Sequence, residues 1–271
     1  MDRGSLDRPL FGNGPALEWQ ERFDIALGTA RGLAYLHGGC EHKIIHCDVK
    51  PENILLHDHF QAKIGLSKLL TPEQSSLFTT MRGTRGYLAP EWLTNSAISE
   101  KTDVYNFGMV LLELVSGECS GANNSLSSSV MGLVYFPLFA LEMHEQGRYL
   151  EVGARRSRLE GRVSNKEVEK LVRIALCCIH EEPALRPSMA TVVGMLEGGL
   201  PLTQAQPRVE SLIFFRFYGR RFTEASMVDD ENRQSDDQLM LYQQQNSIVT
   251  TASDTYFSLM SSQKSQAPDN V

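Results

Sequence analysis

The sequence predicts an α+β domain that is mainly α-helical. Apolar residues recur at helical spacing from Leu17 to His37, and Val104 to Ser116 is apolar on most faces, as in a helix inside a core. Between these two segments, residues 43–56 place a polar loop between short apolar stretches with the character of strands. We therefore expect a helical domain with short β-hairpins at this loop.

The other elements follow from local signals. Gly38 and Gly39 are expected to stop the first helix, and Gly117 to end the central one. Strands are predicted at 44–45, 54–56 and 61–64, with a hairpin turn over 57–60. Further helical patterns lie at 142–144, 167–180 and 189–196, while the basic run 152–158 is expected to be a solvated loop.

Length and composition limit the class of protein. A chain of 271 residues with 42% hydrophobic content can bury a large core, so we expect one large domain with a tail. The net charge of −7 gives no indication of a nucleic-acid partner. Five cysteines without framework spacing favour a reducing compartment, hence a cytoplasmic location. The longest apolar run, 130–141, contains Pro137 and is too short for a transmembrane segment, and the N-terminus lacks the apolar core of a signal peptide.

The polar loop carries a set of groups suited to phosphoryl transfer. Asp48, Lys50 and Asn53 place a carboxylate, an ammonium and an amide on one short turn. A carboxylate can orient a hydroxyl and take its proton, an ammonium can neutralise charge on a phosphoryl group, and an amide oxygen can bind magnesium.

This loop resembles the catalytic loop of protein kinases, which reads H-R-D-L-x-x-x-N, whereas this chain reads HCDVKPEN at 46–53. The motifs GTRGYLAPEW, DVYNFG and RPSM follow in the family's order. The chain is similar to plant receptor-like serine/threonine kinases, in particular the group with lectin-type ectodomains. The resemblance covers residues 1 to about 200 and corresponds to the large C-terminal lobe of a kinase domain. Because no Gly-rich phosphate loop, strand lysine or helix glutamate precedes Met1, we expect the small lobe to be absent.

The resemblance implies roles for individual residues, with ATP and magnesium as the ligands. Asp48 would orient and deprotonate the substrate hydroxyl, and Lys50 would stabilise the phosphoryl group and contact the nucleotide. Asn53 would hold magnesium and contact the nucleotide. Leu55 would line the floor of the adenine pocket, and Thr84 would hydrogen-bond the catalytic aspartate.

Four further residues are expected to be structural. By resemblance, His46 packs under the activation segment, and Asp103 hydrogen-bonds the backbone of the catalytic loop. An ion pair is expected between Glu91 and Arg186, because buried charges persist only when they are paired.

The chain departs from the family at the magnesium site. Plant receptor-like kinases would place Ser-Asp-Phe between Ile64 and Gly65, which gives the D-F-G motif, but here the two residues are adjacent. The nearest upstream carboxylate, Asp58, lies at the opposite end of its strand. We therefore expect Asn53 to be left as the only evident side-chain ligand for magnesium.

A second departure concerns regulation. Cys47 replaces the arginine that many kinases place before the catalytic aspartate, as in the non-RD receptor-like kinases. That arginine needs a phosphate on the activation segment, so phosphorylation of Thr79 or Thr80 is not expected to be the activating switch. The Cys47 thiol is expected to be inert, because Asp48 beside it should raise its pKa.

Three domain segments are predicted: the kinase large lobe over 1–200, an extension over 201–222 that packs on the lobe or contacts a membrane surface, and a disordered Ser- and Gln-rich tail over 223–271. The parent family faces the cytosol at the plasma membrane and is membrane-anchored.

Three hypotheses for function remain open. The first is a protein serine/threonine kinase, of which this sequence is an incomplete record. The second is an inactive kinase fragment that binds partner kinases or substrates through the surface Thr84–Trp92. The third is a fragment without function, which would aggregate through the surface that normally meets the small lobe.

Overall fold

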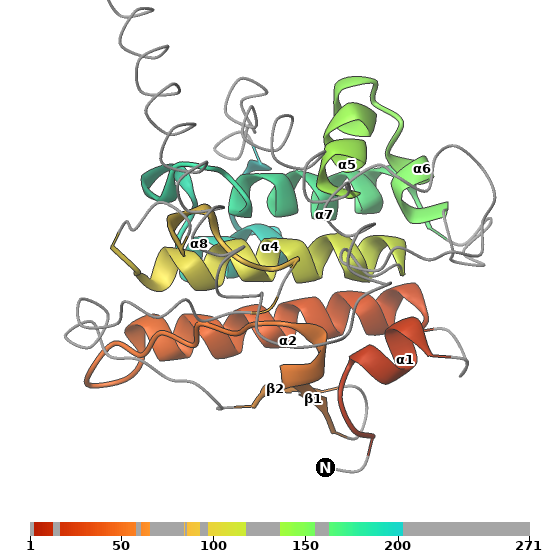
Figure 1. Ribbon diagram of the computed structural model, residues 1–271. Coiled ribbons are helices and arrows are strands. Elements are labelled where there is room, and N and C mark those ends of the chain that lie inside the picture. The colour runs from red at the N-terminus through yellow and green to blue at the C-terminus, as the bar shows by residue number, and fades with distance from the viewer. Residues whose placement is uncertain are drawn as a thin grey trace, which may run out of the picture.

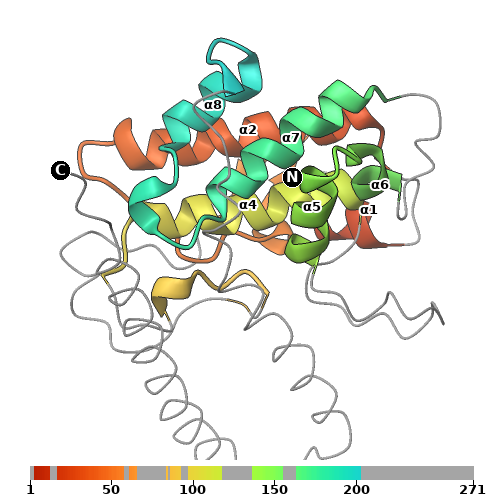
Figure 2. The ribbon, with the colours of Figure 1, turned by 90° about the horizontal axis from the view of Figure 1, so that it is seen from above.

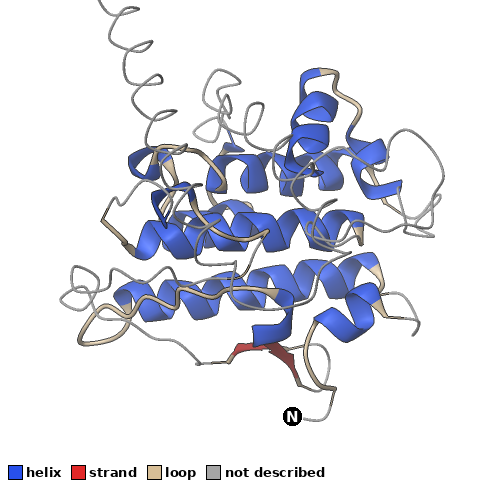
Figure 3. Cartoon of the chain, in the orientation of Figure 1, coloured by secondary structure: helices blue, strands red, loops and turns tan. Residues whose placement is uncertain are grey.

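A stack of long helices forms the body of the protein (Figure 1). The computed structural model describes residues 3–12, 17–57, 61–65, 84, 86–92, 97–117, 136–154 and 163–202. Helix α4 (Glu100–Ser116) packs against α2 (Trp19–Gly38) on one side and α7 (Asn165–Cys178) on the other. A two-stranded sheet lies on the far side of α2 from α4 (Figure 3). The predicted α+β, mainly helical class is confirmed.

Helix α2 matches the prediction to within two residues. It begins with a capping box in which the side chains of Glu18 and Glu21 each accept the other residue's backbone N–H. Its buried face is mostly apolar and also contains Arg22 and Thr29, and Gly39, not Gly38, is the capping residue at its end. The N–H of Gly39 donates to the carbonyl of Tyr35 over 2.8 Å. The helix therefore ends one residue later than the glycine pair suggested.

Helix α4 is the centre of the core. Its residues from Thr102 to Ser116 are all buried, which confirms the core helix predicted from the segment 104–116 that is apolar on most faces. The helix begins four residues before the predicted Val104, because the Ser99 side chain caps it by accepting the N–H of Lys101. Gly117 ends it in the left-handed conformation, with φ of 72°.

The hairpin pairs β1 (Ile54–Leu56) with β2 (Ala62–Ile64) in antiparallel register, so Leu55 lies opposite Lys63. An N-terminal segment adds to its other edge: Leu6 N–H donates to Ile54 O and Leu56 N–H to Gly4 O, each over 2.8 Å. Helix α1 (Asp7–Phe11) follows at once. The sheet therefore packs against α2 on one side. Because β1 directly follows the catalytic loop, the sheet also connects that loop to the first residues of the chain.

The predicted strand at 44–45 is wrong. Ile44 lies in a loop, and Ile45 forms only an isolated bridge. The N–H of Ile44 donates to the Leu36 carbonyl over 2.9 Å. It therefore pairs with a carbonyl in the last turn of α2 instead of with a neighbouring β-strand. A contact between distant parts of the chain overrides local β-propensity here.

Helices α5 (Phe136–Glu145) and α6 (Tyr149–Ala154) lie at one end of α4 and α7 (Figure 2). The pattern at 142–144 therefore marks only the end of a longer helix. The loop predicted over 152–158 is wrong at its start, because Val152 is fully buried within α6, which packs on α7. Residues 155–158 lie outside the described part of the chain.

Helix α8 (Met189–Glu197) packs on α2 and completes the described fold. Within the ranges given above, no helix is both long and apolar enough to cross a membrane. The predicted extension beyond residue 202 and the tail lie outside the described residues, as do Asp58, Thr79 and Thr80. The domain boundaries therefore stay predictions.

Candidate active site

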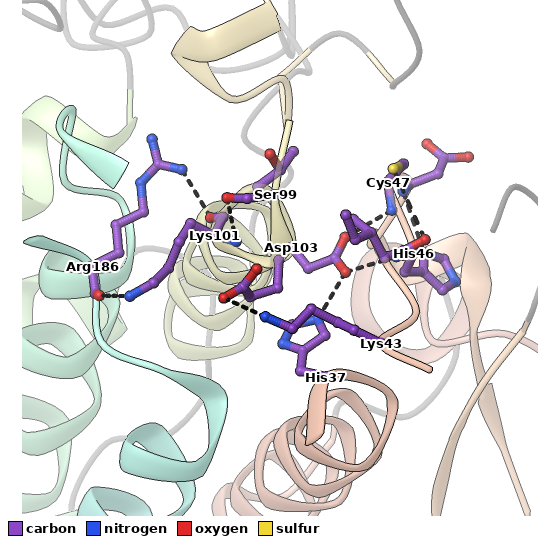
Figure 4. Close-up of polar contacts among 12 residues, drawn as sticks. His37, Lys43, His46, Cys47, Ser99, Lys101, Asp103 and Arg186 are labelled. Carbon is purple, nitrogen blue, oxygen red and sulfur yellow. Dashed lines mark hydrogen bonds and ion pairs between the residues drawn. The ribbon is translucent and has the colours of Figure 1, made fainter. Parts of the chain in front are cut away.

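The catalytic loop is held from below by a buried carboxylate of α4. Asp103 is fully buried, and it accepts the N–H of His46 at Oδ2 and the N–H of Cys47 at Oδ1, each over 2.7 Å (Figure 4). The predicted contact between Asp103 and the loop backbone is present. Two adjacent backbone donors on one carboxylate fix the path of the loop just before Asp48.

Cys47 adopts the left-handed conformation, with φ of 65°, and is the one described non-glycine residue with a positive φ. Such a conformation is unusual for a residue with a Cβ and persists only where neighbouring contacts determine it. Here the bond to Asp103 holds the backbone, and the side chain is fully buried. The turn at Cys47 directs the next residue, Asp48, toward the site.

Three side chains predicted as catalytic meet in one hydrogen-bonded chain. Lys50 Nζ donates to Thr84 Oγ1 over 2.7 Å, and Thr84 Oγ1 donates to Asp48 Oδ1 over 2.9 Å. Lys50 Nζ also lies 3.7 Å from Asp48 Oδ2. The predicted contact between Thr84 and Asp48 is therefore present, and it joins residues that are 36 positions apart.

Asn53 braces the same carboxylate from the short helix η1 (Pro51–Asn53). Its Nδ2 donates to the Asp48 carbonyl over 2.8 Å and to Asp48 Oδ2 over 3.1 Å. With Thr84 at the other oxygen, both carboxylate oxygens of Asp48 accept hydrogen bonds, which fixes the orientation of this side chain. Such a carboxylate can receive a proton from a substrate hydroxyl that comes within hydrogen-bond distance of it.

The end of β2 is tied directly to the loop at Gly65. Its N–H donates to the Asn53 carbonyl over 2.7 Å, and its carbonyl lies 2.7 Å from His46 Nε2. His46 Nδ1 accepts the N–H of Asp48 over 3.3 Å, so Nε2 carries the proton and donates to Gly65. His46 is thus a fully buried brace for Gly65, while the activation segment under which it is predicted to pack lies outside the described residues.

The residues described at the site do not fit a magnesium ion. The Asn53 amide hydrogens face Asp48, which leaves its Oδ1 as a possible ligand, while both Asp48 oxygens already accept hydrogen bonds. Strand β2 reaches Gly65 without a carboxylate, and the described residues hold no cluster of three acidic, histidine or cysteine side chains. Magnesium is usually held by at least one carboxylate together with phosphate oxygens, a ligand set that the described residues do not supply.

Leu55, the predicted floor of the adenine pocket, lies in the middle of β1. It is half-buried, whereas Ile54 and Leu56 on the opposite face are fully buried. Ser5 pairs with it in an isolated bridge. Ser5 was not singled out from the sequence, because nothing local marks it as a neighbour of Leu55, and the nucleotide role of Leu55 stays a prediction.

The predicted ion pair between Glu91 and Arg186 is present and buried. Arg186 Nη1 and Nη2 donate to Glu91 Oε1 and Oε2 over 2.7 and 2.8 Å, in a bidentate arrangement. Thr102 Oγ1 donates to Glu91 Oε1 over 2.8 Å. Lys101 Nζ donates to the Arg186 carbonyl. The pKa of Lys101 is lowered, mainly by burial; the charge of Glu100 raises this pKa and the charge of Arg186 lowers it.

Sequence reasoning missed a further buried carboxylate, which lies on α4. Glu113, in the apolar stretch of α4, is fully buried and accepts the hydroxyl of Tyr87, with 2.8 Å to each carboxylate oxygen. The signal was available, because an acidic residue within a helix that is apolar all round needs a partner. Tyr87 and Glu113 thus tie the segment 86–92 to the central helix.

Together, the fold and this loop define a protein kinase domain. The chain belongs to the protein kinase family, whose domain model matches residues 1–195. It is 68% identical over 251 residues to a G-type lectin S-receptor-like serine/threonine-protein kinase of Arabidopsis thaliana, which covers 86% of this chain and 28% of that protein. It is 47% identical over 237 residues to the Arabidopsis kinase SD2-5 of the same class, covering 83% and 27%. A rice relative, LECRK4, is 45% identical over 202 residues, covering 73% and 24%.

These comparisons confirm the resemblance to lectin-type receptor-like kinases. The chain spans about a quarter of the length of these relatives. Kinases of this family act on proteins, and the family implies ATP and magnesium as ligands. The particular activity, substrates and location of this chain are therefore matters for proposal.

Proposed function

We propose that the catalytic loop of this chain serves transfer of the γ-phosphoryl group of ATP to serine or threonine hydroxyls of proteins. The observation that supports this most strongly is the chain of contacts from Lys50 through Thr84 to Asp48. In this reaction the hydroxyl oxygen forms a bond to the γ-phosphorus, the bond to the ADP oxygen breaks, and the hydroxyl proton passes to Asp48.

The other described residues support that role through position and charge. The Lys50 ammonium, held by the Thr84 hydroxyl, can offset charge on the transferring phosphoryl group. Asn53 fixes Asp48 from the opposite side, and Leu55 would contact the adenine ring. By likeness to the receptor-like relatives, we place this domain on the cytosolic side of the plasma membrane, acting on protein substrates.

A second candidate is an inactive lobe that binds partner kinases or substrates. The direct sequence of Ile64 and Gly65 favours it, because neither residue supplies a carboxylate for a metal. In addition, the backbone N–H and C=O of Gly65 are already hydrogen-bonded to Asn53 and His46. The binding surface would be the segment Thr84–Trp92. Under this proposal, Leu88→Ala should weaken capture of partner kinases by the purified chain, and unchanged capture would contradict it.

Calorimetric titration with ATP, with and without magnesium, distinguishes the two candidates. The 271-residue chain is compared with Asp48→Asn and with two insertion variants that place Ser-Asp-Phe or Ser-Asn-Phe between Ile64 and Gly65. The same variants are also assayed for phosphotransfer to a protein substrate. Magnesium-dependent ATP binding by the parent chain, together with phosphotransfer that Asp48→Asn abolishes, supports the kinase. Binding gained only with Ser-Asp-Phe supports the inactive lobe and assigns its defect to the missing carboxylate. Phosphotransfer that survives Asp48→Asn would refute the proposed base.

A further inference from the structure

A side-chain hydrogen bond joins the end of α5 to the start of α6. His144, in the last turn of α5, places Nδ1 2.8 Å from the hydroxyl of Tyr149, the first residue of α6. The two rings pack in a tilted arrangement, with centroids 5.7 Å apart. Tyr149 is 7% exposed, so its hydroxyl has little access to water. The pair therefore ties together two helices that lie at one end of the lobe (Figure 2).

The donor and the acceptor of this bond follow from the surroundings of the hydroxyl. Among the described residues, His144 Nδ1 is the one hydrogen-bond partner of the Tyr149 hydroxyl. A buried hydroxyl hydrogen without an acceptor is unfavourable, so the hydroxyl donates and Nδ1 accepts. A ring nitrogen that accepts carries no proton, which places the proton of the neutral ring on Nε2. His144 in this contact is therefore the neutral Nε2–H tautomer.

The charged groups around the ring act on it in opposite directions. Burial lowers the pKa of His144 most, and the charge of Arg173 on α7 lowers it further. Glu145 on α5 and Glu169 on α7 raise this pKa by less, so that it lies below the ordinary value of 6.5. Helix α4 also contacts α5 and α6, but no described charged side chain of α4 is among these groups. The surroundings therefore favour the neutral ring.

We infer that the contact between His144 and Tyr149 is an acid-sensitive switch that releases the turn between α5 and α6. When Nδ1 takes a proton from the solvent, the lone pair that accepted the hydroxyl is used, and two donors then face each other. Glu169, the carboxylate that acts on the Tyr149 hydroxyl, is already paired with Arg173 over 3.2 Å. The new positive charge on the ring also adds to that of Arg173. Protonation therefore breaks the contact.

The turn that this contact bridges lies at the surface, where residues 145–148 are exposed. Gly147 adopts a φ of 68°, and its N–H donates to the His144 carbonyl over 3.1 Å. The N–H of Arg148 donates to the Met143 carbonyl over 2.8 Å. Loss of the side-chain contact should therefore appear first as more frequent opening of these two backbone bonds. No step of this switch requires phosphotransfer, so the inference is independent of the proposed function.

The 271-residue chain labelled with ¹⁵N tests the protonation state without a variant. Two-bond correlation spectra of the imidazoles should show His144 with Nε2 protonated and Nδ1 bare at neutral pH. The ring should titrate at a lower pH in the folded chain than in the chain unfolded in urea. Because the folded pKa lies below the unfolded one, the stabilisation is present above pH 6.5 and is lost as pH falls through the folded pKa. A proton on Nδ1 at neutral pH would overturn the inference.

Amide hydrogen exchange reads the turn itself, as protection factors that correct for the pH dependence of exchange in free amides. From neutral pH to about pH 5, protection of Gly147 and Arg148 should fall about fivefold relative to Ala30 in α2, since one hydrogen bond is lost. Tyr149→Phe should show the lowered protection already at neutral pH, with little further change. Tyr35→Phe, at a tyrosine of α2 that is 63% exposed, is the matched control and should behave as the parent.

His144→Asn offers a rescue that a purely space-filling role does not predict. The asparagine side-chain oxygen can accept the Tyr149 hydroxyl near the place of Nδ1 and does not titrate, so protection should stay high at both pH values. Equal protection of the parent at both pH values, or a fall with pH that persists in Tyr149→Phe, would contradict the switch. If a variant does not fold, the tautomer and the titration of the parent chain decide.

Discussion

Replacing Arg186 by Met should destabilise the lobe strongly, because it leaves a buried carboxylate without its cation. Arg186 is 1% exposed and Glu91 3% exposed, and the pair shares two charge-assisted hydrogen bonds. In Arg186→Met, Glu91 keeps the Thr102 hydroxyl, while the carbonyls of Lys101 and His180 lose a donor. Breaking a buried pair on one side costs about 3–5 kcal/mol, a large part of the roughly 5–15 kcal/mol that stabilises a domain.

Urea unfolding of the 271-residue chain at pH 7, followed by circular dichroism, measures this loss. The double variant Glu91→Gln with Arg186→Met should recover part of it, because no charge is then left buried. The coupling energy is the loss in the double variant minus the separate losses in Arg186→Met and Glu91→Gln. Arg31→Met is the control: its ion pair with Glu197 is 60% and 42% exposed and should contribute at most about 1 kcal/mol. A loss below about 1 kcal/mol in Arg186→Met, or strict additivity in the double variant, would refute the reasoning.

Three other changes test the packing and the buried polar groups. In thermal melts, Gly108→Ala should lower the free energy of unfolding by about 1–3 kcal/mol, because a Cβ there would lie 2.7 Å from side-chain carbons of α7 and its cap. The control is Gly153→Ala, where the nearest atom to the new Cβ would lie 3.8 Å away, and it should be neutral or stabilising. Tyr87→Phe should cost about 1–3 kcal/mol in urea unfolding, since Glu113 loses a hydroxyl donor in the core; an unchanged midpoint would show that other partners suffice. Burial raises the pKa of Cys177 from 9.0 to about 12, so the folded thiol keeps a proton that the unfolded chain loses above pH 9, and stability should fall as pH rises from 9 toward 12. Cys177→Ala should reduce that slope, and an identical slope would count against a buried thiol.

The sequence predicted the parts of the fold that periodicity and motif order determine. Helix α2 shows apolar spacing over five turns, and α4 has no polar face except where buried groups find partners. The contacts Thr84 to Asp48 and Glu91 to Arg186 followed from motifs in family order, since their spacing in the chain is too long for any local rule.

The parts that were mispredicted depend on contacts between distant segments. Ile44 has the composition of a strand, yet its N–H satisfies the end of α2. Val152 opens a basic run, but its own side chain is fully buried at the face of α7. The contact between His37 and Asp103 joins residues that are 66 positions apart. No periodicity in the sequence carries such pairings, because each depends on where another helix ends.

The site's proton-accepting part and its metal-binding part differ in how many contacts support them. Asp48 is oriented by Thr84 and Asn53, and the loop that carries it is anchored by Asp103, so these contacts come from separate elements of the lobe. The metal carboxylate expected from the family depends on one position after β2, and the junction at Gly65 closes without it. The omission of three residues expected there from the family would remove a ligand, while the described contacts of Asp48 are all present. An intact catalytic loop is therefore compatible with either proposed function, and the carboxylate after β2 is the feature that separates them.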